Sequence, residues 1–262
     1  MAQFNKITPA ALMRLIGKPG APRLIDVCID DDFAEDPRLI PTSKRVPYLE
    51  IAQACAGAAR IVVICQKGKK LSHGAAALLR TQGIEAEVLE GGIHGWRDAG
   101  LPLTPAAALR GKLWVTRHRP KIDRIACPWL LRRFVDPRAE VMFVPPKEVM
   151  AVAERFGATA FDCPNAPFRD ADQKSSFDAL LAEFQLYIPA LNKVADMVRA
   201  ADLDDLAAEP QAAGLLAASV GFSKMFKNDH EQMEATFPLY DALYRWARDG
   251  QAETHSHREG AA

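Results

Sequence analysis

A single cysteine among lysines carries the clearest chemical signal in the sequence. Cys65 follows the apolar residues 61–64 and precedes the polar run Gln66, Lys67, Gly68, Lys69 and Lys70. The thiolate of cysteine attacks electrophiles, and nearby positive charge favours that anion over the thiol. The three lysines would therefore stabilise a sulfur anion, whether thiolate or persulfide, and attract an anion such as thiosulfate. The alternative for Cys65 alone is a structural thiol, since free cysteine is usually buried.

The segments around Cys65 predict a strand, a loop, a helix and a second strand. Residues 61–64 form a short, continuous apolar run, which is typical of a strand buried on both faces of a parallel sheet. Residues 71–82 show helical spacing before Gly83, and residues 85–89 indicate the next strand. Ligands of such sheets bind at the carboxyl ends of the strands. We therefore expect Cys65 beside the positive end of the helix, with backbone N–H groups of the loop directed at its sulfur.

Several motifs across the first half occur in the order found in rhodanese domains. They are Leu24-Ile25-Asp26-Val27, Ile40-Pro41, Val46-Pro47-Tyr48, the loop from Cys65 to Lys70, Glu90-Gly91-Gly92-Ile93-His94-Gly95-Trp96 and Gly100-Leu101-Pro102. Residues 1 to about 105 therefore resemble a rhodanese domain. The resemblance implies a three-layer α/β domain with a parallel sheet. It also implies that Cys65 is the catalytic residue carrying sulfane sulfur as a persulfide, that the loop stabilises it, and that Asp26 supports the site.

Two positions depart from the rhodanese pattern. Cys28 stands where many rhodaneses have an arginine, and Lys70 replaces the arginine common at the sixth loop position. Lysine is a point charge and lacks the flat, two-pronged donor set of arginine, so oxyanion recognition would differ. A phosphatase relative of the fold would need arginine six residues after the cysteine, where this chain has Leu71.

Composition narrows the class of protein. The 262 residues include 33 basic and 33 acidic side chains, so no net charge draws the protein to nucleic acid or to an anionic membrane. The five cysteines include no Cys-x-x-Cys pair, which argues against a zinc site or a disulfide framework. The acidic run at residues 30–32 favours a solvated loop over a cation site.

We expect no metal and no cofactor. Because no leader or bilayer-spanning apolar run is evident, we expect a soluble, cytoplasmic protein.

Breaks in the pattern divide the chain. We predict a rhodanese-like domain at 1–106, a linker at 107–111, a mainly helical α+β domain at 112–250 and a disordered tail at 251–262. In the first domain Thr8 should cap a helix starting at Pro9, a strand should cover 24–28 and a helix 47–59. In the second, strands are expected at 113–116 and 141–144, with helices after Pro146.

The second half opens with a basic loop followed by a helical pattern. Asp123 is expected to cap a helix through Phe134, with Pro128 kinking or restarting it. The stretch from Trp114 to Pro137 and later segments, including Leu239-Tyr-Asp-Ala-Leu-Tyr, resemble the C-terminal domain of the chromate-resistance protein ChrB over about 112–250. The resemblance implies a role in handling or sensing chromate.

Arginine-rich geometry near a helix start could hold a tetrahedral dianion. The oxyanion candidates in this second domain are Arg117, His118, Arg119, Asp123, Arg124 and Cys127, with Arg132 and Arg133 also available. The alternative is that Arg132 and Arg133 form a solvated helix face and that Asp123 pairs with a nearby arginine. Cys163 is a further candidate, as an acceptor of sulfur from Cys65.

Two functions follow from these residues. The first is a sulfurtransferase that moves sulfane sulfur from a donor such as thiosulfate to a thiol or cyanide through Cys65. The second is a non-catalytic module that senses or binds chromate or a related oxyanion. The expected partners are thus a sulfur donor, a thiol acceptor and, in the second case, chromate. A membrane or nucleic-acid partner is not indicated.

Overall fold

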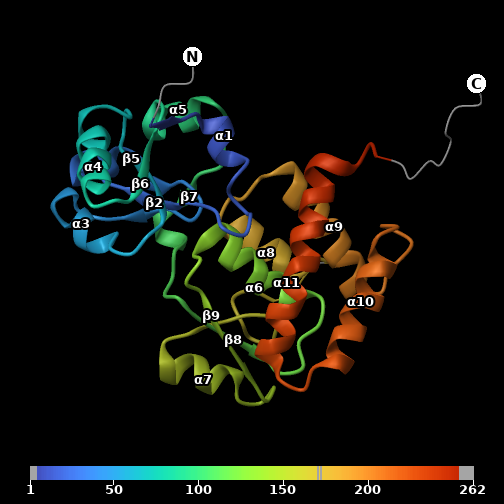
Figure 1. Ribbon diagram of the computed structural model, residues 1–262. Coiled ribbons are helices and arrows are strands. Elements are labelled where there is room, and N and C mark those ends of the chain that lie inside the picture. Colours follow the sequence, from blue (N-terminus) through green and yellow to red (C-terminus); the bar gives the residue numbers. More distant parts are fainter. Residues whose placement is uncertain (1–4, 170, 172, 254–262) are drawn as a thin grey trace, which may run out of the picture.

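The computed structural model describes residues 5–169, 171 and 173–253, which form two lobes (Figure 1). The first lobe contains a five-stranded parallel sheet in the order β1-β6-β5-β2-β4. Its central strand is β5, the apolar run predicted from the sequence, and residues 61–64 are fully buried. The strands are β1 (Lys6–Ile7), β2 (Arg23–Asp26), β4 (Lys44–Arg45), β5 (Arg60–Ile64) and β6 (Glu85–Leu89).

Helices cover both faces of this sheet, which confirms the three-layer α/β prediction. In Figure 1, α3 and α4 lie on one side and α1 and α5 on the other. Thr8 caps α1 as predicted, through a hydrogen bond from the Ala11 N–H to its hydroxyl. The helices of this lobe are α1 (Pro9–Met13), α2 (Asp30–Glu35), the 3₁₀ turn η1 (Tyr48–Glu50), α3 (Ile51–Ala54), α4 (Lys70–Thr81) and α5 (Gly92–Asp98). A two-stranded antiparallel pair, β3 (Arg38–Leu39) with β7 (Thr104–Pro105), and the 3₁₀ turn η2 (Ala106–Ala108) close the lobe.

Three local predictions in this lobe were wrong. The acidic run at residues 30–32 begins helix α2 and is not a loop, because carboxylates in a first turn favour the positive helix end. The strand expected at 24–28 ends at Asp26, whose carboxylate accepts the Cys28 N–H at 2.8 Å and turns the chain away from the sheet. The helix expected at 47–59 stops at Ala54, and Gly57 takes a positive φ of 73° shortly afterwards.

The second lobe is rich in helix, as predicted, and its few strands form a small parallel sheet. The sheet has the order β10-β8-β9 and comprises β8 (Leu113–Arg117), β9 (Glu140–Val144) and β10 (Thr159–Ala160). Helix α7 (Val149–Phe156) packs on β8. The remaining helices are α6 (Asp123–Leu130), η3 (Leu131–Val135), α8 (Ser176–Glu183), α9 (Pro189–Asp202), α10 (Ala212–Met225), α11 (Asp229–Arg245) and η4 (Trp246–Gly250), of which η3 and η4 are π-helical turns.

Asp123 does not cap its own helix, contrary to the prediction. Ile122 occupies the N-cap position with a φ of 40°, and Asp123 is the first residue inside α6. Its buried carboxylate instead accepts the backbone N–H groups of Ser176 at 2.8 Å and Phe177 at 3.1 Å. It therefore satisfies donors at the start of α8, 53 positions later in the chain. Pro128 lies inside α6, which continues into η3.

Gly17 and Phe134 form a close contact between the two lobes. Gly17 of the first lobe has a φ of 81°, and a Cβ built there would lie 2.2 Å from Cζ of Phe134 in η3. Nearby, Arg248 donates to the Arg14 carbonyl at 3.2 Å and Asp249 forms an ion pair with Arg14 at 3.8 Å. The absence of a side chain at Gly17 thus allows the phenylalanine ring to reach the first lobe.

Some predictions stay open. The domain limits at 106 and 112 and the cytoplasmic location stay predictions, and the tail predicted as disordered lies outside the described residues from 254 onward. Within the described part of the chain, none of the helices has the length and apolar character needed to cross a bilayer.

Candidate active site

Cys65 lies at the carboxyl end of the central strand β5. The neighbouring strand β2 pairs with β5 in parallel, with Asp26 opposite Ile64, and the Val27 N–H donates to the Ile64 carbonyl at 2.9 Å. Cys65 is 6% exposed, and the loop after it leads directly into α4. The structure thus brings Cys65 and the loop residues to the edge of the sheet where ligands of parallel sheets bind.

Two glycines allow the loop to fold tightly against the start of α5. Gly68 has a φ of 62°, and a Cβ there would lie 2.6 Å from the Leu89 carbonyl oxygen. Gly92 has a φ of 60°, and a Cβ there would lie 2.1 Å from the Cys65 carbonyl oxygen and 2.5 Å from the Gly68 nitrogen. Both positions therefore require glycine, for conformation and for space.

Backbone hydrogen bonds hold the loop at this close approach. The Ile93 N–H donates to the Cys65 carbonyl and the His94 N–H to the Gln66 carbonyl, each at 3.1 Å. The motif beginning at Gly91-Gly92 thus sets the position of the reactive loop although it lies 26 residues further along the chain. The sequence shows the motif, but its contact with Cys65 and Gln66 becomes evident only in the structure.

The Cys65 sulfur is hydrogen bonded to a serine that the sequence analysis did not single out. Sγ lies 3.1 Å from Oγ of Ser72, a fully buried residue in the first turn of α4. The Ser72 hydroxyl also donates to the Lys69 carbonyl at 3.1 Å. If Cys65 loses its proton, a rotation of the Ser72 hydroxyl places a donor on the sulfur anion. The signal available in the sequence was a hydroxyl seven positions after the cysteine. The expected loop N–H donors to sulfur stay a prediction.

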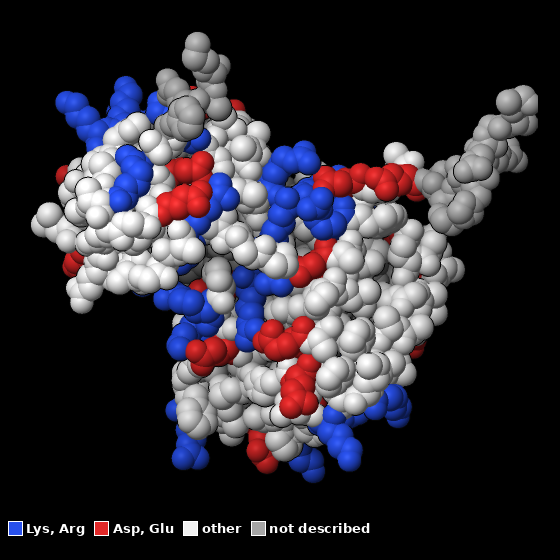
Figure 2. All heavy atoms as spheres, in the orientation of Figure 1, with Lys and Arg blue, Asp and Glu red and all other residues white. Residues whose placement is uncertain are grey.

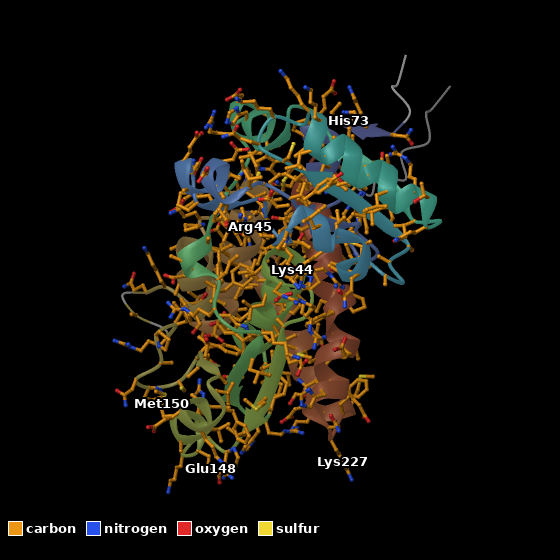
Figure 3. The ribbon with its side chains drawn as sticks, turned by 90° about the vertical axis from the view of Figure 1, so that its left-hand side faces the viewer. Lys44, Arg45, His73, Glu148, Met150 and Lys227 are labelled. Atoms are coloured by element: carbon orange, nitrogen blue, oxygen red, sulfur yellow. The ribbon has the colours of Figure 1, made fainter. Side chains whose placement is uncertain are left out.

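The loop that follows Cys65 carries three exposed lysines. Lys67, Lys69 and Lys70 are exposed, and within the described residues none of them forms an ion pair. Their charge is therefore available to an incoming anion. The sulfur also lies near the start of α4, a helix of 12 residues whose positive end adds to the same effect. His73 is exposed on α4 and lies at the outer surface of the lobe in Figure 3.

A small cavity lies beside the loop, on the side of the buried Asp26. It has a volume of about 150 Å³ and is lined in part by Asp26, Cys28 and Gln66. Burial raises the pKa of Asp26, while hydrogen bonds from Cys28 oppose that shift. Burial also raises the pKa of the Cys28 thiol, with the charge of Asp26 as the next cause. Gln66 is held by a bond from its amide nitrogen to the Glu35 carboxylate at 2.8 Å.

The second-domain candidates form a network of pairs with acidic side chains and backbone groups. Asp162, which is 4% exposed, accepts from Arg117 and forms an ion pair with Arg124, each at 3.0 Å. Burial lowers the pKa of Arg124 and the charge of Asp162 raises it. Arg119 donates to the carbonyls of Ser223 and Phe226 in and after α10. An oxyanion at these arginines would compete with Asp162.

The remaining candidates in this region differ in their exposure to solvent. The Cys127 side chain is fully buried and lies 3.4 Å from an Asp123 oxygen, and burial raises the pKa of this thiol well above its usual value. His118 is exposed and its N–H donates to the Val144 carbonyl. Cys163 is 5% exposed and packs in a small cluster with Val115. No cluster of three or more His, Cys, Asp or Glu side chains within the described ranges could hold a metal ion.

Comparison with known proteins identifies both halves of the chain. The model of the ChrB C-terminal domain matches residues 114–247, and the model of the rhodanese-like domain matches residues 8–99. The chain belongs to the ChrB C-terminal domain family. It carries a rhodanese-like domain before that region, as the sequence motifs predicted.

A curated relative of the chain also carries the name ChrB. Protein ChrB of Cupriavidus metallidurans is 29% identical over 145 residues, which cover 55% of this chain and 43% of the relative. The chain thus spans less than half the length of that relative.

Solved structures with similarity to the chain include two from the rhodanese group. A thiosulfate sulfurtransferase from Pseudomonas aeruginosa is 29% identical, with 39% of this chain and 20% of that chain covered and a TM-score of 0.34. A rhodanese-related protein from Thermoplasma volcanium is 25% identical, with 38% and 97% covered and a TM-score of 0.33.

Proposed function

We propose that this protein is a sulfurtransferase in which Cys65 carries sulfane sulfur as a persulfide. The observation that carries the proposal is the placement of Cys65. It directly follows a central parallel strand and lies next to Ser72 Oγ, in a loop that Gly92 allows to fold tightly and that carries three exposed lysines without ion-pair partners in the described residues. The rhodanese-like match over residues 8–99 supports the same chemistry. We further propose a link to chromate resistance, which the ChrB-type domain supports.

The reaction would proceed in two displacements. The Cys65 thiolate attacks the outer sulfur of thiosulfate, the sulfur–sulfur bond breaks, and sulfite leaves with the electron pair. The product is a Cys65 persulfide anion. A thiolate acceptor or cyanide then attacks the terminal sulfur and releases the Cys65 thiolate, so no external oxidant or reductant is needed. The loop lysines would attract thiosulfate, and the positive end of α4 with the Ser72 hydroxyl would stabilise the sulfur anions.

The test is mass spectrometry of the protein after incubation with thiosulfate. The parent should gain the mass of one sulfur atom and form thiocyanate when cyanide is added. Cys65→Ser should do neither, whereas Cys55→Ser, which changes a buried thiol of the same lobe that does not line the loop, should behave as the parent. Equal labelling of Cys65→Ser and the parent, or no labelling of the parent with thiosulfate and no thiocyanate, would refute the assignment.

Transfer onward to Cys163 is a separate part of the proposal. Burial raises the pKa of the Cys163 thiol, and the charge of Arg117 opposes that shift. If Cys163 accepts sulfur from Cys65, Cys163→Ser should slow transfer to an external thiol. Unchanged transfer rates in Cys163→Ser would remove Cys163 from the pathway.

The alternative is a non-catalytic module that binds chromate or a related oxyanion. The observation in its favour is the ChrB-type domain, which covers residues 114–247. Its predicted site includes Arg117 and Arg124, which in the structure share Asp162 as an ion-pair partner. Titration of chromate and of sulfate should then give saturable binding that Arg117→Ala removes. Binding that Arg117→Ala leaves unchanged would exclude this site.

A further inference from the structure

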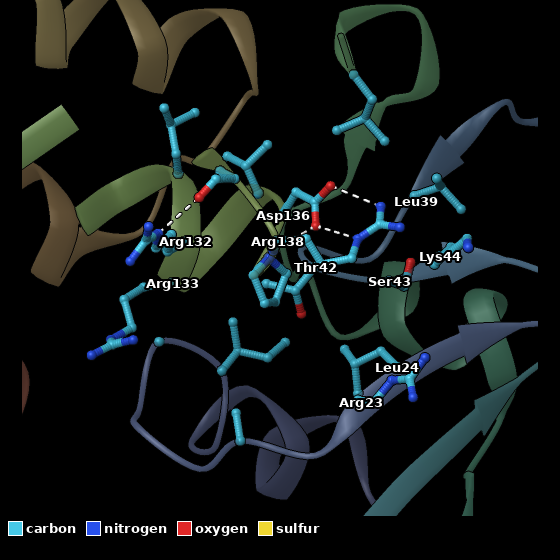
Figure 4. Close-up of a pocket in the computed structure, with 18 of the residues that line it drawn as sticks. Arg23, Leu24, Leu39, Thr42, Ser43, Lys44, Arg132, Arg133, Asp136 and Arg138 are labelled. Atoms are coloured by element: carbon cyan, nitrogen blue, oxygen red, sulfur yellow. Dashed lines mark hydrogen bonds and ion pairs between the residues drawn. The ribbon is translucent and has the colours of Figure 1, made fainter. Parts of the chain in front are cut away.

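A large cavity lies where the two lobes meet. Its volume is about 660 Å³, and its walls include residues 16–18, 20–25 and 42–45 of the first lobe and residues 131–133 and 135–139 of the second. Figure 4 shows Ser43 and Lys44 on one wall and Arg132, Asp136 and Arg138 facing the same space. Cavities of roughly 300–1,000 Å³ at domain junctions are the usual sites for small organic ligands.

Positive charge dominates the lining of this cavity. The first lobe contributes Lys18, Arg23, Lys44 and Arg45, and the second contributes Arg110, Arg132, Arg133 and Arg138. Asp136 is the one acidic side chain among the described residues that line it. In Figure 2, Lys and Arg side chains gather along the line between the two lobes. The cavity thus has a strongly cationic wall in a protein whose formal net charge is zero.

Several of these cations lack a carboxylate partner. Five of the eight are paired with a carboxylate: Arg133 with Asp241, Arg138 with Asp136, Arg45 with Asp30 and Arg110 with Glu183, each at 2.8 Å, and Arg132 with Glu234. By contrast, no ion pair involves Lys18, Arg23 or Lys44 within the part of the chain that the structure describes. Burial lowers the pKa of Lys18, and the positive charges of Arg245, Arg248 and Arg14 lower it further. An anionic ligand would relieve this accumulation of like charge.

A buried hydroxyl in the same wall lacks a partner. Ser43 is 7% exposed, lines the cavity, and its Oγ has no hydrogen-bond partner within the described residues. A buried polar group left unpaired costs free energy, roughly 1–3 kcal/mol. The preceding Thr42 has a φ of 68°, which is unusual for a β-branched residue. A ligand oxygen or ring nitrogen in the cavity would satisfy the hydroxyl.

The cavity also has apolar surface. Leu24, Leu39 and Leu131 line it together with the buried Trp114. A bare tetrahedral oxyanion would use only the cations and fill little of the volume. A ligand with both an apolar ring system and several negative charges matches both kinds of wall.

We propose that this cavity binds a nucleotide, through contacts of its phosphates with the unpaired cations and of its base and sugar with the apolar wall. Lys44 lines the cavity from the first lobe and Asp136 lines it from the second. The charge of Lys44 helps to lower the pKa of Asp136 across the junction. A bound nucleotide would therefore join the two lobes. This binding is independent of the chemistry at Cys65.

The test is isothermal titration calorimetry of the full chain with ADP. We expect saturable binding at one site, weakened at least about tenfold by Lys44→Glu, which corresponds to roughly 1.4 kcal/mol. The matched control is Lys227→Glu, an exposed lysine at the far end of the second lobe, well separated from Lys44 in Figure 3. Far-UV circular dichroism checks that both variants fold.

Further arms of the experiment separate the alternatives. Ser43→Ala should weaken ADP binding about threefold to tenfold while leaving the fold intact. Adenosine and pyrophosphate should each bind at least about tenfold more weakly than ADP. The proposal is overturned if the parent does not bind ADP at millimolar concentration, or if Lys44→Glu and Lys227→Glu bind it equally. Pyrophosphate binding as tight as ADP, or a DNA duplex binding while ADP does not, would likewise overturn it.

Discussion

Replacement of Gly92 by alanine should disconnect the reactive loop from the start of α5. The added Cβ would lie 2.1 Å from the Cys65 carbonyl oxygen, so the two segments must separate. The positive φ of 60° costs an alanine about 1–2 kcal/mol. Separation also breaks the two bonds from the Ile93 and His94 N–H groups, each worth about 1 kcal/mol. We therefore expect Gly92→Ala to lower the free energy of unfolding by about 3–4 kcal/mol.

The matched control for this change is Gly83→Ala. Gly83 has a φ of 77°, and nothing lies within 4 Å of a Cβ built there, so this variant tests the backbone conformation alone. It should cost only about 1–2 kcal/mol. Urea unfolding gives both free energies, and mass spectrometry after thiosulfate reports persulfide formation. Gly83→Ala should gain sulfur as the parent does, whereas Gly92→Ala should not. Equal stability losses in the two variants, with equal labelling, would refute the role assigned to Gly92.

Three other changes probe the site and its support. Ser72→Ala removes the hydroxyl beside Cys65 Sγ and should leave the fold nearly unchanged. In rapid-mixing assays this variant should form thiocyanate about tenfold more slowly than the parent. An unchanged rate would show that the Ser72 hydroxyl takes no part in the reaction. Gly17→Ala inserts a methyl group at the Phe134 ring and should lower the thermal midpoint. In a Phe134→Ala background the part of this loss that comes from the clash should disappear, while the cost of the positive φ of 81° remains, and strict additivity would contradict this reasoning. Burial raises the pKa of Asp26 above its usual 3.8, so the native state binds this proton more tightly than the unfolded state and loses stability as the pH rises above that value. Asp26→Asn should therefore gain stability relative to the parent as the pH is raised from about 4 in a series of urea titrations, and a constant difference would argue against it.

The fold of the first lobe was predictable because its signals are local. The apolar run at residues 61–64 has one stable solution, a strand buried on both faces, and the structure places it at the centre of the sheet. The cap at Thr8 depends only on the next three residues. The short helix α2 was missed because three consecutive aspartates also suit a loop. Their preference for a helix start is decided by the chain that follows.

The contacts that shape the two sites join residues far apart in sequence, and this is why the sequence could suggest the residues but not their partners. Arg117 and Arg124 indicated an anion site because several arginines lie near a helix start in the sequence. In the structure Asp162, about 40 residues later, occupies that position. The opposite holds for Lys44, which has no distinguishing sequence context but lines the junction of the lobes, where no ion pair involves it within the described residues. Charge available to a ligand is therefore a property of the folded chain. In this protein it lies at the Cys65 loop and at the junction of the lobes, whereas the most arginine-rich stretch is largely neutralised by its own fold.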